Sequence, residues 1–401
     1  MSSMTDSTRA YWAAYEQRQQ QMNDVREAAR KLSEKFPLSY WREHDKDPGK
    51  YPWEFVKAFA AAGWMGIMMP EEVGGMNLGL SEAAILMQEI AASGAGMSGA
   101  SAIHFYVFPP APILKHGSEE MKRRLLPQLA KGEHLMAFGV TEPTAGVDTS
   151  RIKTRAEKKG DRWVINGQKV WSTNAQNANK YLILARTSPR DEKRPLDGMT
   201  LFFADMDRKH CDVRVIDKLG RAAIDSNEVF IDGLEVPEEN VIGEVGKGFH
   251  YLLDGLNPER VVVATECIGI GRAALKLATK YANERVIFDR PIGKNQAVAH
   301  PLAEAWMRLE AADKVAHHAA MLFDAGQPCG AESNTAKFLG ADAGWQAADQ
   351  AMQTHGGYAY AKEYHIERLW REVRLLRLAP VSQEMVCNFI SNKVLGLPKS
   401  Y

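Results

Sequence analysis

Residues 138–148 read FGVTEPTAGVD and mark the point at which the pattern of the sequence changes from helices to strands. Upstream, residues 1–137 carry apolar side chains at helical spacing, and Ser81–Ala92 is the clearest predicted helix. Downstream, residues 138–246 read as short strands separated by charged, turn-rich segments. The stretch therefore predicts a boundary between an N-terminal helical domain and a middle β domain.

The middle region predicts a barrel or a sandwich, because many short strands joined by turns are typical of these folds. Its clearest strands are Tyr181–Ala185, Thr200–Ala204 and Glu228–Ile231. Within Arg162–Val170, Asn166-Gly167 separates two β-rich runs, and this dipeptide favours a tight type I′ turn. We therefore expect a hairpin centred on these two residues.

From residue 247 to 401 long amphipathic helices return and predict a four-helix bundle. Two apolar stripes support this, and they consist of Leu302, Trp306, Leu309, Ala316, Ala320 and Phe323, and of Ile366, Leu369, Val373 and Leu376. Gly356-Gly357 can end a helix that begins near Thr335, since glycine accepts the left-handed conformation. The predicted fold is mainly α with a central β domain, divided at 1–137, 138–246 and 247–401.

The composition limits the classes of partner. Lys+Arg and Asp+Glu both number 50 in a chain of 401 residues, so charge gives no reason to expect nucleic acid or an anionic membrane. The polar N-terminus lacks the apolar core of a signal peptide, and no apolar run is long enough to span a bilayer. The four cysteines form no CxxC pair, so we expect neither zinc nor disulfides, and reduced thiols in the cytoplasm.

Four motifs, in order along the chain, resemble those of the acyl-CoA dehydrogenase family, and the resemblance runs from about Ala62 to the C-terminus. They are FGVTEPTAGVD (138–148), WST (171–173), ERVIFDRPIGKNQ (284–296), and QTHGGY (353–358) with EYHIERLWR (363–371). The family's fold has the same order of helices, β domain and helical bundle. The resemblance implies bound FAD, an acyl-CoA substrate, a homotetramer and electron transfer flavoprotein as electron acceptor.

The first two motifs are implied to hold the flavin and its pyrophosphate. The residues that match cofactor contacts are Phe138, Val140, Thr141, Gly146 and Val147, where the family usually has serine at the last position. Trp171 matches a stacked aromatic, Ser172 lies between, and Thr173 matches a hydrogen-bond partner near flavin N5. The alternative for the first motif is an ordinary interdomain turn, and the alternative for Trp171 is a tryptophan of the β-domain core.

The later motifs are implied to complete the FAD site of a neighbouring subunit. The matching residues are Arg285, Phe288, Gln296, Gln353, Gly356, Gly357 and Ser382, and the family's glycine after Phe288 is Asp289 here. A guanidinium suits a diphosphate because it is planar, always charged and bidentate. The alternative for Arg285 is an arginine at a solvated helix end, and the alternative for Gly356-Gly357 is a glycine pair that only caps a helix.

The catalytic base departs from the family's common pattern. Many members carry a Glu in a YEGTS stretch, but residues 378–383 read LAPVSQ and place Ala379 or Pro380 there. A minority branch, resembling isovaleryl-CoA and long-chain acyl-CoA dehydrogenases, carries the Glu before an Arg in an earlier helix. Residues 256–261, LNPERV, match it with Glu259 and Arg260. The alternative is that Glu259 is only a charge near a helix N-terminus, with Pro258 in the first turn.

The implied reaction is α,β-dehydrogenation of an acyl-CoA to the trans-2-enoyl-CoA. Glu259 would remove the α-proton, Arg260 would position the base or the thioester, and the N–H of Ala379 would polarise the thioester carbonyl. Two rivals stay open: an acyl-CoA oxidase or flavin monooxygenase of the same fold, and an acyl-CoA-binding homologue without a base. The sequence specifies neither chain length nor branching of the acyl group.

Overall fold

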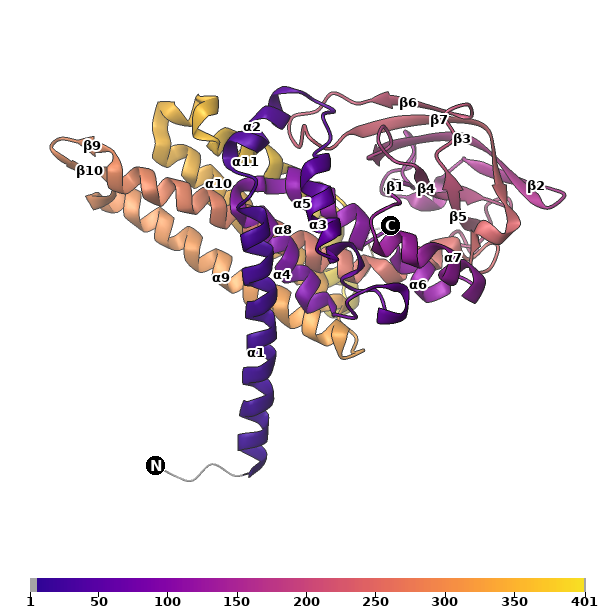
Figure 1. Ribbon diagram of the computed structural model, residues 1–401, viewed down its shortest axis with the longest axis horizontal. Coiled ribbons are helices and arrows are strands. Elements are labelled where there is room, and N and C mark those ends of the chain that lie inside the picture. Colours follow the sequence, from indigo (N-terminus) through magenta and orange to yellow (C-terminus); the bar gives the residue numbers. More distant parts are fainter. Residues whose placement is uncertain (1–5, 400–401) are drawn as a thin grey trace.

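A computed structural model describes residues 6–399, so residues 1–5 of the polar N-terminal stretch and the last two residues lie outside the described part. Along the chain, helices are followed by a β domain and then by helices again (Figure 1). The predicted fold class is therefore confirmed. The change from helix to strand lies between Ala130 and Met136, and the return to helix lies between Ile242 and Gly248.

The N-terminal helices are α1 (Asp6–Ser33), α2 (Leu38–Lys46), α3 (Trp53–Ala61), α4 (Leu80–Ile90), α5 (Gly96–Val107), α6 (Ala111–His116) and α7 (Glu119–Ala130). The helix predicted at Ser81–Ala92 is confirmed as α4, which a π-helical turn, Ala91–Ala95, joins to α5. Figure 1 shows the first half of α1 projecting away from the other helices. The apolar stretch of α4 and α5 is deeply buried because both helices pack against α8 of the C-terminal region.

The β domain is one eight-stranded sheet in the order β6-β7-β3-β2-β4-β5-β8, with β1 beside β4. The strands are β1 (Met136–Gly139), β2 (Arg155–Lys159), β3 (Arg162–Thr173), β4 (Lys180–Arg186), β5 (Met199–Asp205), β6 (Cys211–Val215), β7 (Ser226–Pro237) and β8 (Val241–Ile242). β2 and β4 pair only through Arg155 and Arg186, and this short contact joins the two halves of the sheet. The ring of Trp163 in β3 then lies 5.7 Å from that of Phe202 in β5, so the two halves face each other as layers.

The hairpin predicted at Asn166-Gly167 is wrong. β3 runs straight through both residues, and the turn between β2 and β3 lies at Gly160, whose φ is +63°. Asn166 instead accepts the backbone N–H of Gly233 at 2.8 Å, and the register against β7 shifts beside it. A Cβ at Gly167 would lie 2.7 Å from the Cα of Thr154, so this glycine permits close approach of two backbones.

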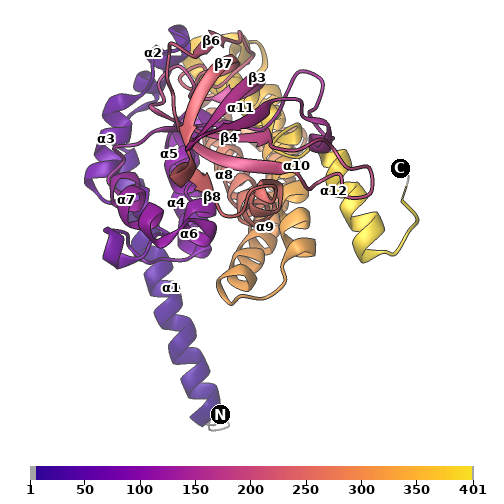
Figure 2. The same cartoon turned by 90° about the vertical axis from the view of Figure 1, so that its right-hand side faces the viewer.

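The C-terminal region is a helical bundle, seen from a second side in Figure 2. Its helices are α8 (Gly248–Glu284), α9 (Gln296–Asp324), α10 (Gly330–His355), α11 (Ile366–Arg374) and α12 (Gln383–Phe389), and a small hairpin, β9 (Val286–Ile287) and β10 (Arg290–Pro291), joins α8 to α9. α8, α9 and α10 pack against one another, and α11 packs on α10. α10 ends at His355, with Gly356 as its C-cap as predicted, although it begins at Gly330, before Thr335.

One member of the predicted apolar stripes is misplaced. Leu302, Leu309 and Ala316 of α9 are buried, but Trp306 between them is 56% exposed. No helix within residues 6–399 is long and apolar enough to cross a membrane.

Candidate functional site

The loop after β1 carries the residues of the first motif. Phe138 and Val140 are half-buried and pack against the apolar cluster of the sheet, and the carbonyl of Thr141 accepts the N–H of Val170 at 2.9 Å. Gly146 and Val147 are exposed, and no atom lies within 4 Å of where a Cβ on Gly146 would be. The tip of the loop thus leaves backbone groups open to a ligand while its base is fixed to the sheet.

A buried ion pair fixes this loop, and sequence reasoning missed it. The Nζ of Lys169 in β3 donates to Glu142 Oε1 at 2.9 Å and to the carbonyl of Val140 at 3.0 Å. Glu142 also accepts the backbone N–H groups of Lys153 and Thr154 at 2.6 and 2.9 Å. Burial lowers the pKa of Lys169 to about 8 against the attraction of Glu142. Two charged groups are therefore held in the sheet to shape one loop.

The three residues of the second motif point in different directions at the end of β3. Trp171 has φ +60° and is 56% exposed, so the alternative of a core tryptophan is wrong. The hydroxyl of Ser172 lies 3.2 Å from that of Tyr181 inside the sheet, and its carbonyl accepts Asn227 Nδ2 at 2.9 Å, so both groups are used within the β domain. Thr173 is buried at the inner end of the strand. An exposed ring and a buried hydroxyl thus flank the same edge of the domain.

Arg221, which no motif indicated, fixes the buried hydroxyl of Thr173 by a hydrogen bond. Its guanidinium lies in the segment between β6 and β7 and donates to the hydroxyls of Ser101, Thr173 and Ser226 at 3.3, 3.3 and 3.0 Å. Because a guanidinium only donates, the Thr173 oxygen must accept, and its own proton is left for another acceptor. Burial lowers the pKa of Arg221, while Glu266, Asp225 and Glu372 oppose that effect.

Glu259 lies in the interior of α8, which begins at Gly248. The alternative of a helix-end charge is therefore wrong, and Pro258 does not lie in the first turn. The side chain is half-buried, and among residues 6–399 it has no hydrogen-bond or ion-pair partner. Burial raises the pKa of Glu259, an effect that His104 and Arg260 reduce and Glu266 reinforces. Such a carboxylate is more basic than one in water.

Arg260 follows Glu259 and is held by its own helix. Its Nη1 donates to Asn257 Oδ1 at 2.9 Å. Burial lowers the pKa of Arg260, and the charge of Glu259 raises it. The buried Nε has no hydrogen-bond partner in the described part of the chain, so this guanidinium has a donor free for a further acceptor.

The residues of the last two motifs meet at the other end of the molecule. Arg285, Gln353, Gly356 and Gly357 line one pocket of about 440 Å³, together with Tyr281 and Tyr358. The guanidinium of Arg285 lies 5.6 Å from the ring centre of Tyr358. Figure 1 shows the adjoining β9–β10 hairpin at the opposite side of the chain from the sheet that bears β3. The two predicted groups of cofactor residues are therefore separated within one chain.

Two other residues at this end are strongly solvent-exposed. Phe288 at the tip of the hairpin is 93% exposed, and Gln296 is exposed at the start of α9. Val286 and Ile287 on the same hairpin are also exposed, and a contiguous apolar tip of this kind is typical of a surface that another molecule covers.

One predicted role near the C-terminus needs correction. The N–H of Ala379 donates to the carbonyl of Leu375 at 3.0 Å, so it is not free to polarise a thioester. Ser382 is the N-cap of α12, and its hydroxyl accepts the N–H of Met385 at 3.4 Å. Its hydroxyl also donates to the carboxylate of Glu384, and Ser382 contacts none of the residues described above around Glu259.

Comparison with protein families matches three consecutive domain models. The acyl-CoA dehydrogenase N-terminal domain matches residues 19–133, the middle domain residues 137–234, and the C-terminal domain residues 246–395.

Individual proteins agree with these matches. The chain is 36% identical over 348 residues to an acyl-CoA dehydrogenase of Bacillus subtilis, covering 86% of this chain and 91% of that protein. It is 35% identical over 390 residues to acyl-CoA dehydrogenase fadE12 of Mycobacterium bovis, covering 94% and 98%. Its fold superposes on butyryl-CoA dehydrogenase from Megasphaera elsdenii with a TM-score of 0.88 and 29% identity, covering 93% and 98%.

Proposed function

Since this chain belongs to the acyl-CoA dehydrogenase family, which is flavin-dependent, we propose that it oxidises an acyl-CoA at the α and β carbons with Glu259 as base. The chain is an enzyme of this class. The observation that carries the assignment of the base is a half-buried carboxylate without a protein partner, beside Arg260. Thr173 lies next to the helices of this site, because Arg221 donates both to Thr173 and to Ser101 of α5, and α5 packs against α8.

The residues present suit FAD as the cofactor. Thr173 has a hydroxyl proton to donate, Trp171 exposes its ring, and the loop ending at Val147 exposes backbone groups. Arg285 and the glycines at Gly356 offer a cation and open backbone in one pocket, as a diphosphate requires. When bound, FAD supplies the acceptor for the β-hydride.

The protein's own part in the reaction is proton removal and positioning. Glu259 takes the α-proton of the thioester as the β-hydrogen leaves as hydride, which yields the enoyl-CoA. Burial of this carboxylate disfavours its charge and so strengthens it as a base. Arg260, with a free donor, holds the thioester or the carboxylate in place.

We expect the purified protein to be yellow, and acyl-CoA to bleach it under anaerobic conditions. The measurement is the visible flavin absorbance during titration with a panel of straight and branched acyl-CoAs, which also identifies the preferred acyl group. Reoxidation by electron transfer flavoprotein supports a dehydrogenase, whereas rapid reoxidation by air supports an oxidase. A colourless protein that FAD cannot reconstitute contradicts the proposal, and binding of acyl-CoA without bleaching indicates a homologue that lacks a working base.

We also propose that each flavin site is completed by a neighbouring subunit in a homotetramer. Support comes from the separation of the two groups of cofactor residues and from the exposed ring of Phe288. Arg285→Ala should weaken FAD binding about ten- to hundredfold, the value of a lost hydrogen bond to a charged group. Arg290→Ala, on the same hairpin and bonded to Asn295, is the control and should retain FAD.

Light scattering with flavin absorbance checks this arrangement. The wild-type protein should be larger than a monomer at full FAD occupancy. A monomer that keeps all its FAD, or an Arg285→Ala variant that binds FAD as tightly as wild type, excludes the shared site.

A further inference from the structure

A buried histidine–glutamate pair lies on the same face of α8 as Glu259, because Glu266 follows Glu259 by seven residues, or two helical turns. His104 of α5 and Glu266 of α8 approach to 3.0 Å between Nδ1 and Oε1, and their side chains are 8% and 0% exposed. An ionised carboxylate can only accept a hydrogen bond, so Nδ1 carries a proton and Nε2 is the nitrogen that gains or loses the second one. The Oε2 of Glu266 has no hydrogen-bond partner among residues 6–399.

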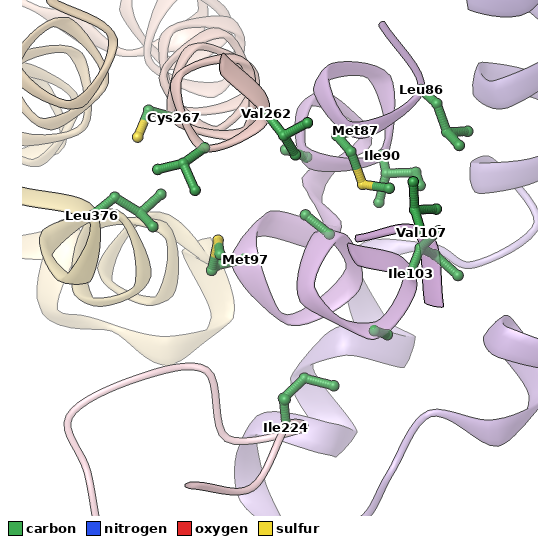
Figure 3. Packing of buried hydrophobic residues seen from close by; sticks show 14 of the residues in the cluster. Leu86, Met87, Ile90, Met97, Ile103, Val107, Ile224, Val262, Cys267 and Leu376 are labelled. Carbon is green, nitrogen blue, oxygen red and sulfur yellow. The ribbon is translucent and has the colours of Figure 1, made fainter. Parts of the chain in front are cut away.

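Hydrocarbon surrounds this pair. Ile103 and Cys267, which adjoin His104 and Glu266 in the chain, belong to the buried apolar cluster that Figure 3 shows between α4, α5 and α8. Charged groups are costly in such a place unless they are paired. A pair used only to join α5 to α8 could be replaced by apolar side chains, so packing alone gives no reason for a titratable group here.

The pair is electrostatically linked to the proposed base. Burial lowers the pKa of His104, but the attraction and hydrogen bond of Glu266, together with Glu259, outweigh it and raise the pKa overall. The charged groups that act on these two residues are Glu266 and Arg260 from α8 and Arg221 from the segment between β6 and β7. Protonated His104 in turn lowers the pKa of Glu259 against the effect of burial.

We propose that His104, oriented by Glu266, is a positioning residue that keeps Glu259 ionised for proton abstraction. This inference rests on the proposed function, because it assigns His104 a role only if Glu259 is the base. Glu266 holds Nδ1 at 3.0 Å, which fixes the ring against α8 and leaves Nε2 to carry the second proton. The imidazolium offsets the effect of burial on the Glu259 carboxylate. Among residues 6–399 no hydrogen bond joins the two side chains, so the carboxylate oxygens stay free for the α-proton.

The test is the pH dependence of anaerobic flavin reduction in holoenzyme carrying His104→Gln. Without the cation, ionisation of Glu259 should require a higher pH, so the midpoint of the rate profile should rise by about one unit or more. The limiting rate at high pH should stay within about threefold of wild type. His44→Gln is the matched control, since His44 is also buried but bonds the carbonyl of Tyr40 in its own helix.

A second measurement tests the pair without substrate. His104 has a raised pKa in the folded protein, so the stability it adds is complete below its unfolded value of 6.5 and is lost as pH rises through the folded value. The difference in urea midpoint between wild type and His104→Gln should therefore shrink as pH rises.

The outcomes separate the two proposals. An unchanged rate midpoint in His104→Gln, or a loss of limiting rate without a shift, overturns the role of His104 even if Glu259→Gln is inactive. If Glu259→Gln keeps the wild-type rate, the proposed base itself is wrong, and the inference about His104 falls with it. A midpoint that rises as expected, with the urea difference shrinking with pH, supports both.

Discussion

Glu259→Gln should slow flavin reduction by acyl-CoA about 100-fold or more, the lower end of what a positioned general base contributes. The amide keeps the shape of the side chain but cannot take a proton, so binding of FAD and acyl-CoA should persist. Anaerobic stopped-flow bleaching isolates this step from the electron acceptor. In wild type, the rate should increase as pH rises through the pKa of Glu259, which burial holds above its usual value.

A matched substitution controls for loss of charge. Glu304→Gln removes an exposed carboxylate that pairs with Arg308 on α9, and it should bleach at the wild-type rate. If Glu259→Gln also bleaches at that rate, Glu259 is not the base. The next carboxylate to test is Glu384, which follows the N-cap Ser382 by two residues. Hydrogen bonds from its own backbone N–H and then from the Ser382 hydroxyl lower the pKa of Glu384.

Lys169→Met should destabilise the protein by about 3–5 kcal/mol, because it leaves the Glu142 charge buried in the sheet without its partner. The loop after β1 should then lose its anchor, so FAD should dissociate more easily. Chemical denaturation of the apoprotein and holoprotein measures the two effects separately. The additional change Glu142→Gln should recover part of the lost stability, since it removes the uncompensated charge.

Lys158→Met provides the comparison on the neighbouring strand. Lys158 pairs with Glu238 on the surface, with both side chains about half exposed, and such pairs contribute less than about 1 kcal/mol. A Lys169→Met variant that loses no more stability than Lys158→Met would show that the buried pair does not hold the loop.

The order of the domains could be predicted because it depends on local periodicity, which each segment carries by itself. Strands β4 and β5 and helix α4 appear where the sequence placed them. The hairpin prediction at Asn166-Gly167 is wrong because contacts with distant residues outweigh the local turn preference. Asn166 accepts the N–H of Gly233, and Gly167 lies against the backbone of Thr154, so both residues stay within a long strand. No short window of sequence contains that information.

The candidate site divides in the same way. Arg285 and Gln353 could be grouped from their motifs, and one pocket brings them together. Arg221, Lys169 and the partners of His104 could not be found, because each acts on residues far along the chain, and His104 and Glu266 are 162 positions apart. The role given to the N–H of Ala379 failed because a turn within the chain uses that group.

The 37-residue helix α8 has a consequence for how the protein tolerates insertions and deletions. Glu259 lies in its first half and Arg285 directly after its end, so about 40 Å of one rod separates them at 1.5 Å per residue. Adding one residue between them would rotate everything downstream by about 100° and displace it along the axis. Under the proposed shared site, such a change would spoil a neighbour's cofactor pocket while leaving the helix's own base in place. Length changes should therefore be confined to loops such as 188–198, and α8 should keep its length among working relatives.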